Sequence, residues 1–104
     1  MRVSEQLRAA KALIADPKNW TRGAFARSAF DNVIGPETEG ACKWCAVGAL
    51  YKVGDVHGRA GNLLWDAAAK IGRGHPALVN DELGHATVLR MFDLAIAKAE
   101  APDA

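Results

Sequence analysis

The C-terminal segment carries the clearest structural signal in this chain. Its apolar residues recur every three or four positions: Val88, Met91, Phe92, Ala95, Ile96 and Ala99. This spacing places them on one face of an α-helix. Weaker stripes with the same spacing predict helices over about residues 4–15, 39–53 and 62–71. The chain is therefore predicted to be mainly α, a compact bundle of about four helices in a single domain spanning residues 1–104.

The ends of these helices follow from residues that cap or break them. Ser4 and Thr38 are candidate N-caps for the first two helices. Pro17 ends the first helix because the residue before proline is pushed out of the α region. Gly54 is expected to stop the second helix, and Pro102 is expected to close the last.

Two stretches lack a sustained helical period. Between residues 23 and 35, the pieces 23–27 and 30–34 fit either two extended strands with a turn or one ragged helix. The missing 3.6-residue period favours the first interpretation, a short β-hairpin. Residues 73–84 are expected to form an irregular connection.

Composition and charge exclude several classes of protein. Charged residues make up 24% of the chain, and 13 Lys and Arg balance 12 Asp and Glu to a net charge of +1. Nucleic-acid binding relies on clustered cations, so it is not favoured. No apolar run approaches the ~18 residues of a membrane span. The N-terminal sequence lacks the apolar core of a signal peptide, so we expect a cytoplasmic protein with free thiols.

Cys42 and Cys45 have C-x-x-C spacing, which four arrangements can explain. The two thiols can be core residues, metal ligands, a redox pair, or a nucleophile with a neighbour. The metal candidates are Cys42, Cys45, His75 and His85, but the two histidines are too far apart in sequence for a typical zinc knuckle. Core packing is favoured, and we expect no cofactor and no committed metal site.

A cysteine nucleophile would need a base and a group to orient that base. Cys45, His85 and either Asn80 or Asp81 supply the right chemical types. The positive end of the last helix would disfavour a charged His85 and leave a neutral imidazole available. Cys45, however, is predicted to lie inside a helix, which is an unusual place for a nucleophile. No catalytic residue is therefore assigned.

Asn80 and Asp81 also have a purely structural interpretation as turn or cap residues before the last helix. Alternatively, they bind a ligand or connect this loop to residues 20–27, with Asp81 paired to Arg22 or Arg27. Tryptophan and arginine are enriched in binding hot spots. The candidate interaction residues are Trp20, Arg22, Arg27 and Trp44.

Three motifs occur in a familiar order along the chain: W-T-R-G-A-F-A-R at residues 20–27, W-C-A-V-G-A-L at 44–50, and N-D at 80–81 followed by H-A-T-V-L-R-M-F-D-L-A-I at 85–96. Their order resembles a family of short bacterial and phage proteins classed as a domain of unknown function. The resemblance implies a phage or prophage setting and a cytoplasmic location. It implies no activity. Cys42 is additional to the family pattern, so a cysteine pair is not transferred from it.

The leading hypothesis is a non-enzymatic accessory protein of phage or prophage type that binds another protein. The alternative is a Cys/His-dependent hydrolase or a metal-binding domain centred on Cys45, His85 and Asn80 or Asp81. An enzyme would bring these side chains together in an accessible cleft. A binding module would bury the thiols and expose an apolar or aromatic surface.

Overall fold

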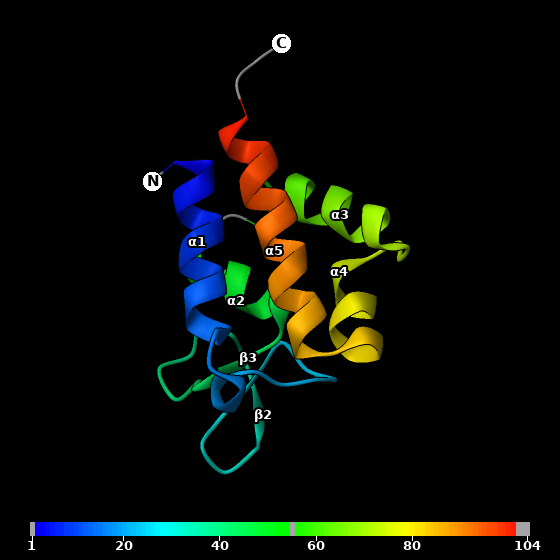
Figure 1. Cartoon of the computed structure of the whole chain (residues 1–104). Coiled ribbons are helices and arrows are strands. Elements are labelled where there is room, and N and C mark those ends of the chain that lie inside the picture. Colours follow the sequence, from blue (N-terminus) through cyan, green and yellow to red (C-terminus); the bar gives the residue numbers. More distant parts are fainter. Residues whose placement is uncertain (1, 55, 102–104) are drawn as a thin grey trace.

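Helices α1 (Val3–Ile14) and α5 (His85–Glu100) lie side by side and run in opposite directions in the computed structural model, which describes residues 2–54 and 56–101 (Figure 1). The ion pairs Arg8–Glu100 and Lys11–Asp93, at 2.8 Å and 2.6 Å, connect the two helices. Because both ion pairs are exposed, each contributes little to the stability of the fold.

The remaining elements follow in the chain order η1 (Pro17–Asn19), β1 (Ala26–Arg27), β2 (Val33–Ile34), β3 (Lys43–Trp44), α2 (Ala46–Val53), α3 (Arg59–Ile71), α4 (Pro76–Leu78) and the π-helical turn η2 (Val79–Leu83). The described residues thus contain five α-helices and one small antiparallel sheet, and the predicted mainly α class is confirmed. No described helix is long and apolar enough to span a membrane.

The core lies between α1, α2, α3 and α5. Helix α5 packs against α1 on one side and α3 on the other, and α2 packs against α1 beneath them (Figure 1). The predicted stripe of the last helix provides much of this core, because Val88, Met91 and Phe92 are fully buried. Helix α5 begins at His85 and ends at Glu100, whereas Pro102, expected to close it, lies outside the described residues.

The three-stranded sheet caps one end of the helices (Figure 1). Strand β1 is central and pairs with both β2 and β3. The hairpin predicted between residues 23 and 35 is confirmed as β1–β2. Its loop ends at Asp31 with a φ of +63°, the left-handed residue that closes a three-residue hairpin loop. The Lys43 amine lies 2.7 Å from the Asp31 carboxylate, and this contact lowers the pKa of Asp31 and ties the loop to β3.

The predicted helix over 39–53 is wrong in its first half. Residues 43–44 form β3, and α2 begins only at Ala46. The backbone turns twice before β3, where the N–H of Thr38 donates to Gly35 and that of Ala41 donates to Thr38. Thr38 is therefore a turn residue and not an N-cap. Pairing with β1 has outweighed the helical spacing of the cysteines and alanines in this stretch.

Three other boundaries differ from the prediction. Helix α1 begins at Val3 with no side-chain cap, so Ser4 lies inside its first turn. Helix α3 begins at Arg59, three residues before the predicted start at 62. The connection over 73–84 is largely helical, since it contains α4 and η2. Pro76 favours this because its fixed φ suits the first position of a helix.

Candidate functional site

The Asn80 side chain joins three segments that are distant in sequence. Its oxygen accepts hydrogen bonds from the indole nitrogen of Trp20 at 2.7 Å and from the backbone N–H of Ala46 at 2.9 Å. Its amide nitrogen donates to the carbonyl of Thr21 and to the carboxylate of Asp81, both at 3.0 Å. These four bonds use the full capacity of a carboxamide. Asn80 is fully buried, so its role is to hold the segments together and not to bind a ligand.

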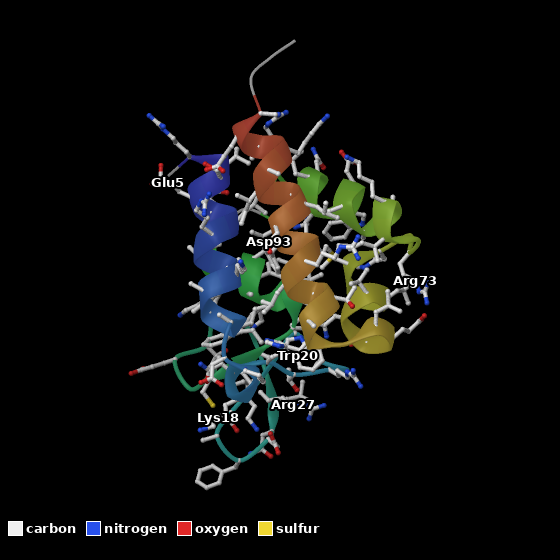
Figure 2. All side chains as sticks on the ribbon, in the orientation of Figure 1. Glu5, Lys18, Trp20, Arg27, Arg73 and Asp93 are labelled. Carbon is white, nitrogen blue, oxygen red and sulfur yellow. The ribbon has the colours of Figure 1, made fainter. Side chains whose placement is uncertain are left out.

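Residues 20–27, which we call the Trp20 segment, reach Asn80 because the chain turns sharply after α1. Asp16 accepts a hydrogen bond from the N–H of Lys18, and Pro17 begins the single turn η1. The chain then leaves η1 in an extended conformation, and Trp20 lies beside Trp44 in a parallel bridge. Figure 2 shows Trp20 at the sheet end of the molecule, near the first turn of α5.

Cys45 is the N-cap of α2 and not a residue inside a helix. Its sulfur accepts the N–H of Gly48 at 3.2 Å, while Asn80 accepts the N–H of Ala46. Two of the N–H groups that lack helical partners at the start of α2 are thereby satisfied. Burial is the main cause that raises the pKa of the Cys45 thiol. The Asp81 carboxylate acts in the same direction, and the N–H groups of Gly48 and Val47 oppose both.

Gly48 allows the chain around Phe25 to reach this helix end. The carbonyl of Phe25 accepts the N–H of Cys45 at 3.1 Å. A Cβ at position 48 would lie 1.9 Å from the same carbonyl oxygen, a distance that no side chain can adopt. The glycine of the W-C-A-V-G-A-L motif is thus required by the close approach of two backbones.

His85 lies near this region but makes other contacts. Its Nε2 is 2.6 Å from the carbonyl oxygen of Ile14. Since a carbonyl only accepts, Nε2 carries a proton. The imidazole also packs against the Trp20 ring, with centroids 5.3 Å apart. Within residues 2–54 and 56–101, no hydrogen bond joins His85 to Cys45, so the imidazole is not placed to act as the base for this thiol.

Asp81 is connected to the Trp20 segment, but through a hydrogen bond and not through the expected ion pair. Its Oδ1 accepts the backbone N–H of Gly23 at 3.1 Å and the Asn80 amide. No salt bridge joins it to Arg22 or Arg27 in the described part of the chain. The N-D pair therefore connects the loop to this segment through a backbone amide and a buried carboxamide.

The metal candidates lie apart. The Cys42 sulfur is 3.8 Å from the carbonyl of Arg27 on the sheet. His75 is the N-cap of α4, where its Nδ1 accepts the N–H of Ala77 at 3.0 Å. In the described ranges, no three His, Cys, Asp or Glu residues are grouped as metal ligands. The two cysteines are free thiols, and Cys45 is buried.

The four candidate interaction residues have different environments. Trp44 is buried, with its indole donating to the carbonyl of Pro36 at 3.0 Å. Trp20 is half-buried, and the guanidinium of Arg22 lies 5.0 Å above its ring. Arg27, which Figure 2 shows at the sheet end, donates from Nε to the hydroxyl of Thr21 at 3.0 Å and from Nη1 to the carbonyl of Asp31 at 3.1 Å. Neither arginine forms a salt bridge among the described residues.

Sequence reasoning missed the most exposed apolar side chains. Phe30 is 89% exposed at the hairpin loop, Val33 is 65% exposed on β2, and Phe25 is 49% exposed just before β1. We call these three residues the hairpin surface. Phe25 and Val33 also line a hollow of about 390 Å³ together with Ala77, Cys45 and Asp81. The predicted hairpin was the available signal, since an apolar residue in its loop has no core to enter.

Comparison with known proteins adds a family but no activity. Neither the curated proteins nor the solved structures include a significant match to this chain. The model of one protein family matches residues 1–98, which contain all three sequence motifs and every residue of the site described above. The chain belongs to the family of unknown function DUF6197.

Proposed function

We propose that this protein is a non-enzymatic binding module that contacts another protein through the hairpin surface. The observation that supports this proposal is the position of the exposed apolar residues. Of the four large hydrophobic side chains exposed in the described chain, Phe25, Phe30 and Val33 form the hairpin surface. The fourth, Leu78, follows Ala77, which lines the hollow beside Phe25 and Val33. Exposed aromatic side chains are enriched in interaction sites.

The hairpin is held in place, which lowers the entropic cost of binding. The Asp31–Lys43 ion pair ties its loop to β3, and Ser28 accepts hydrogen bonds from the N–H groups of Phe30 and Asn32. These contacts restrict the conformations of the loop that carries Phe30.

The charges beside the hairpin favour a partner with acidic groups. Trp20, Arg22, Arg27 and Lys43 line a hollow of about 430 Å³ together with Asp31. Lys43 is paired with Asp31, whereas Arg22 and Arg27 contact a ring and neutral oxygen atoms. An unpaired guanidinium binds a carboxylate with two parallel hydrogen bonds. The proposed partner therefore has an apolar patch flanked by Asp or Glu.

The alternative, a Cys/His-dependent hydrolase or a metal-binding domain, receives less support from the geometry. The raised pKa of Cys45 reduces the thiolate needed for attack. His85 donates to Ile14, and Asn80 has no free hydrogen-bonding atom. The resemblance described above supports a cytoplasmic, phage or prophage setting, which we include in the proposal.

Site-specific photo-crosslinking tests the protein contact. A benzophenone amino acid replaces Phe30 in one variant and Ala12, an exposed residue of α1, in a matched control. In the native host cell, the Phe30 variant should give a discrete adduct that the Ala12 variant lacks. Adding Val33→Ser should remove the adduct. The proposal fails if both positions give the same adducts, or if the adduct survives Val33→Ser.

A further inference from the structure

A third hollow, of about 520 Å³, is lined by Phe25 and by residues of α2 and α3. Its lining residues include the aromatic residues Phe25, Tyr51 and Trp65, the histidines His57 and His75, and Asp66. We call it the aromatic pocket. Tyr51 comes from α2, Trp65 and Asp66 from α3, and His75 from the start of α4, three elements whose arrangement is seen in Figure 1. Its volume is within the usual range for small-molecule sites.

The rings of the aromatic pocket lie on different walls. Phe25 and Tyr51 have centroids 5.4 Å apart with planes tilted by 60°. Tyr51 and His57 meet edge to face at 6.0 Å, and Trp65 and His75 do so at 4.6 Å. Rings inclined in this way cannot all stack on one flat ligand, but they present several faces to a compact group. The faces of Phe25, Tyr51 and Trp65 carry partial negative charge, which attracts cations.

The acidic residue that lines the aromatic pocket also favours a cation. Asp66 is an acidic residue among its lining residues, which include no Lys or Arg. The ion pairs of the described chain leave Asp66 without a partner. The Nδ1 of His75 accepts the N–H of Ala77. An unpaired carboxylate beside aromatic faces favours a cation at the pocket, although Asp66 also lines another hollow with Lys70 and Lys98.

We propose that the aromatic pocket binds an organic cation, an alkylammonium or quaternary ammonium group. The rings would surround its alkyl groups, and Asp66 would balance its charge. Such a group comes either from a free small molecule or from a lysine side chain, methylated or not. Phe25 belongs both to the hairpin surface and to the aromatic pocket. The inference can still be tested separately from the proposed protein contact, because Trp65 and Asp66 lie outside the hairpin surface.

The three tryptophans make the test specific. The indole N–H of Trp20 donates to Asn80 and that of Trp44 to Pro36, whereas the indole N–H of Trp65 donates to no described residue. The full chain labelled with ¹⁵N should therefore show one indole signal that responds to a ligand in the pocket and two that do not. Trp65→Phe assigns the responding signal.

The titration uses tetramethylammonium chloride at constant ionic strength, with tert-butanol as the uncharged ligand of similar shape. We expect a saturable shift of the Trp65 signal with tetramethylammonium only. Asp66→Asn should weaken this binding about tenfold, the scale of one cation–π or charge contact. Glu39→Gln, which removes an exposed carboxylate outside the pocket, should leave the affinity unchanged.

Three results would overturn the proposal: no saturable shift, an equal shift with tert-butanol, or an affinity unchanged by Asp66→Asn. Unmoved Trp20 and Trp44 signals show that each variant is folded. A final comparison separates the two sources of the cation. A short peptide with one trimethyl-lysine binds more tightly than tetramethylammonium if the natural ligand is a protein side chain. It binds equally or less tightly if the ligand is a free small molecule.

Discussion

The carboxamide oxygen of Asn80 lies 2.7 Å from the indole nitrogen of Trp20, although the two residues are 60 positions apart in sequence. Trp20 belongs to the W-T-R-G-A-F-A-R motif and Asn80 to the N-D pair, and the second bond of the same oxygen reaches Ala46 in W-C-A-V-G-A-L. The motifs that characterise this sequence thus meet at one buried side chain. Their co-occurrence has a structural explanation that requires no catalytic role.

Asn80→Ala should lower the free energy of unfolding by about 2–4 kcal/mol, because it leaves the indole of Trp20 and the N–H of Ala46 buried without an acceptor. Urea unfolding measures the change. Asn62→Ala, on the exposed face of α3, is the matched control and should alter stability by less than about 0.5 kcal/mol. Equal effects of the two substitutions would contradict the role assigned to Asn80.

Gly48→Ala should destabilise the protein by about 3 kcal/mol or more, because the added Cβ would overlap the carbonyl oxygen of Phe25 and force two backbones apart. Gly74→Ala is the control, since a Cβ at position 74 meets no atom within 4 Å. Thermal unfolding of both variants checks the prediction. A Gly48→Ala variant as stable as the control would mean that the backbone of Phe25 and α2 are farther apart than described.

Cys45→Ser should retain most of the stability, because a hydroxyl can accept the N–H of Gly48 as the sulfur does. Cys45→Ala removes the cap and should cost about 1 kcal/mol. Chemical denaturation of the three proteins distinguishes the cases. If serine were as damaging as alanine, the sulfur would have a role other than capping.

The raised pKa of Cys45 predicts a loss of stability at alkaline pH. The folded state holds the thiol proton more tightly than the unfolded state, so the stabilisation is complete below the ordinary thiol pKa of about 8.5 and declines as pH rises above it. Unfolding free energies between pH 7 and pH 10 test this. The decline should be smaller in Cys45→Ser, which lacks the titrating group, and equal declines would refute the assignment.

Alkylation of the native protein should modify Cys42 before Cys45, since Cys42 is half-buried and Cys45 is buried with a raised pKa. Mass spectrometry across a pH series, with and without a chelator, resolves the two sites. Fast reaction of Cys45 below pH 8 would instead support the nucleophile hypothesis. Protection that a chelator removes would support a metal.

The sequence predicted the helices that build the core better than the elements that build the site. In α5 the apolar stripe is continuous, and each of its buried positions could be identified from spacing alone. In residues 39–45 the same spacing was misleading, because the pairing of Lys43 and Trp44 with β1 depends on a strand that is distant in sequence. A periodicity argument contains no information about such a partner.

The role of Asn80 was beyond sequence reasoning for a related reason. Asparagine before a helix usually forms local turn contacts, and the N-D pair fits that pattern. Its burial depends on the π-helical turn η2 and on the path of the Trp20 segment, neither of which has a local signature. The sequence did suggest a connection between this loop and the Trp20 segment. It was expected to be an ion pair between arginine and Asp81, whereas the structure makes it through the carboxamide of Asn80.

The antiparallel contact of α1 and α5 has a mechanical consequence. The end of α5 lies beside the half of α1 that is farther from the sheet, where Arg8 pairs with Glu100, and the sheet lies at the other end of both helices (Figure 1). Tension applied through Val3 and Glu100 would therefore separate the two helices progressively from this end. The Arg8–Glu100 contact would be loaded before Lys11–Asp93. Contacts that are loaded one after another resist only a small force, and the hairpin would bear none of it until the helices had separated.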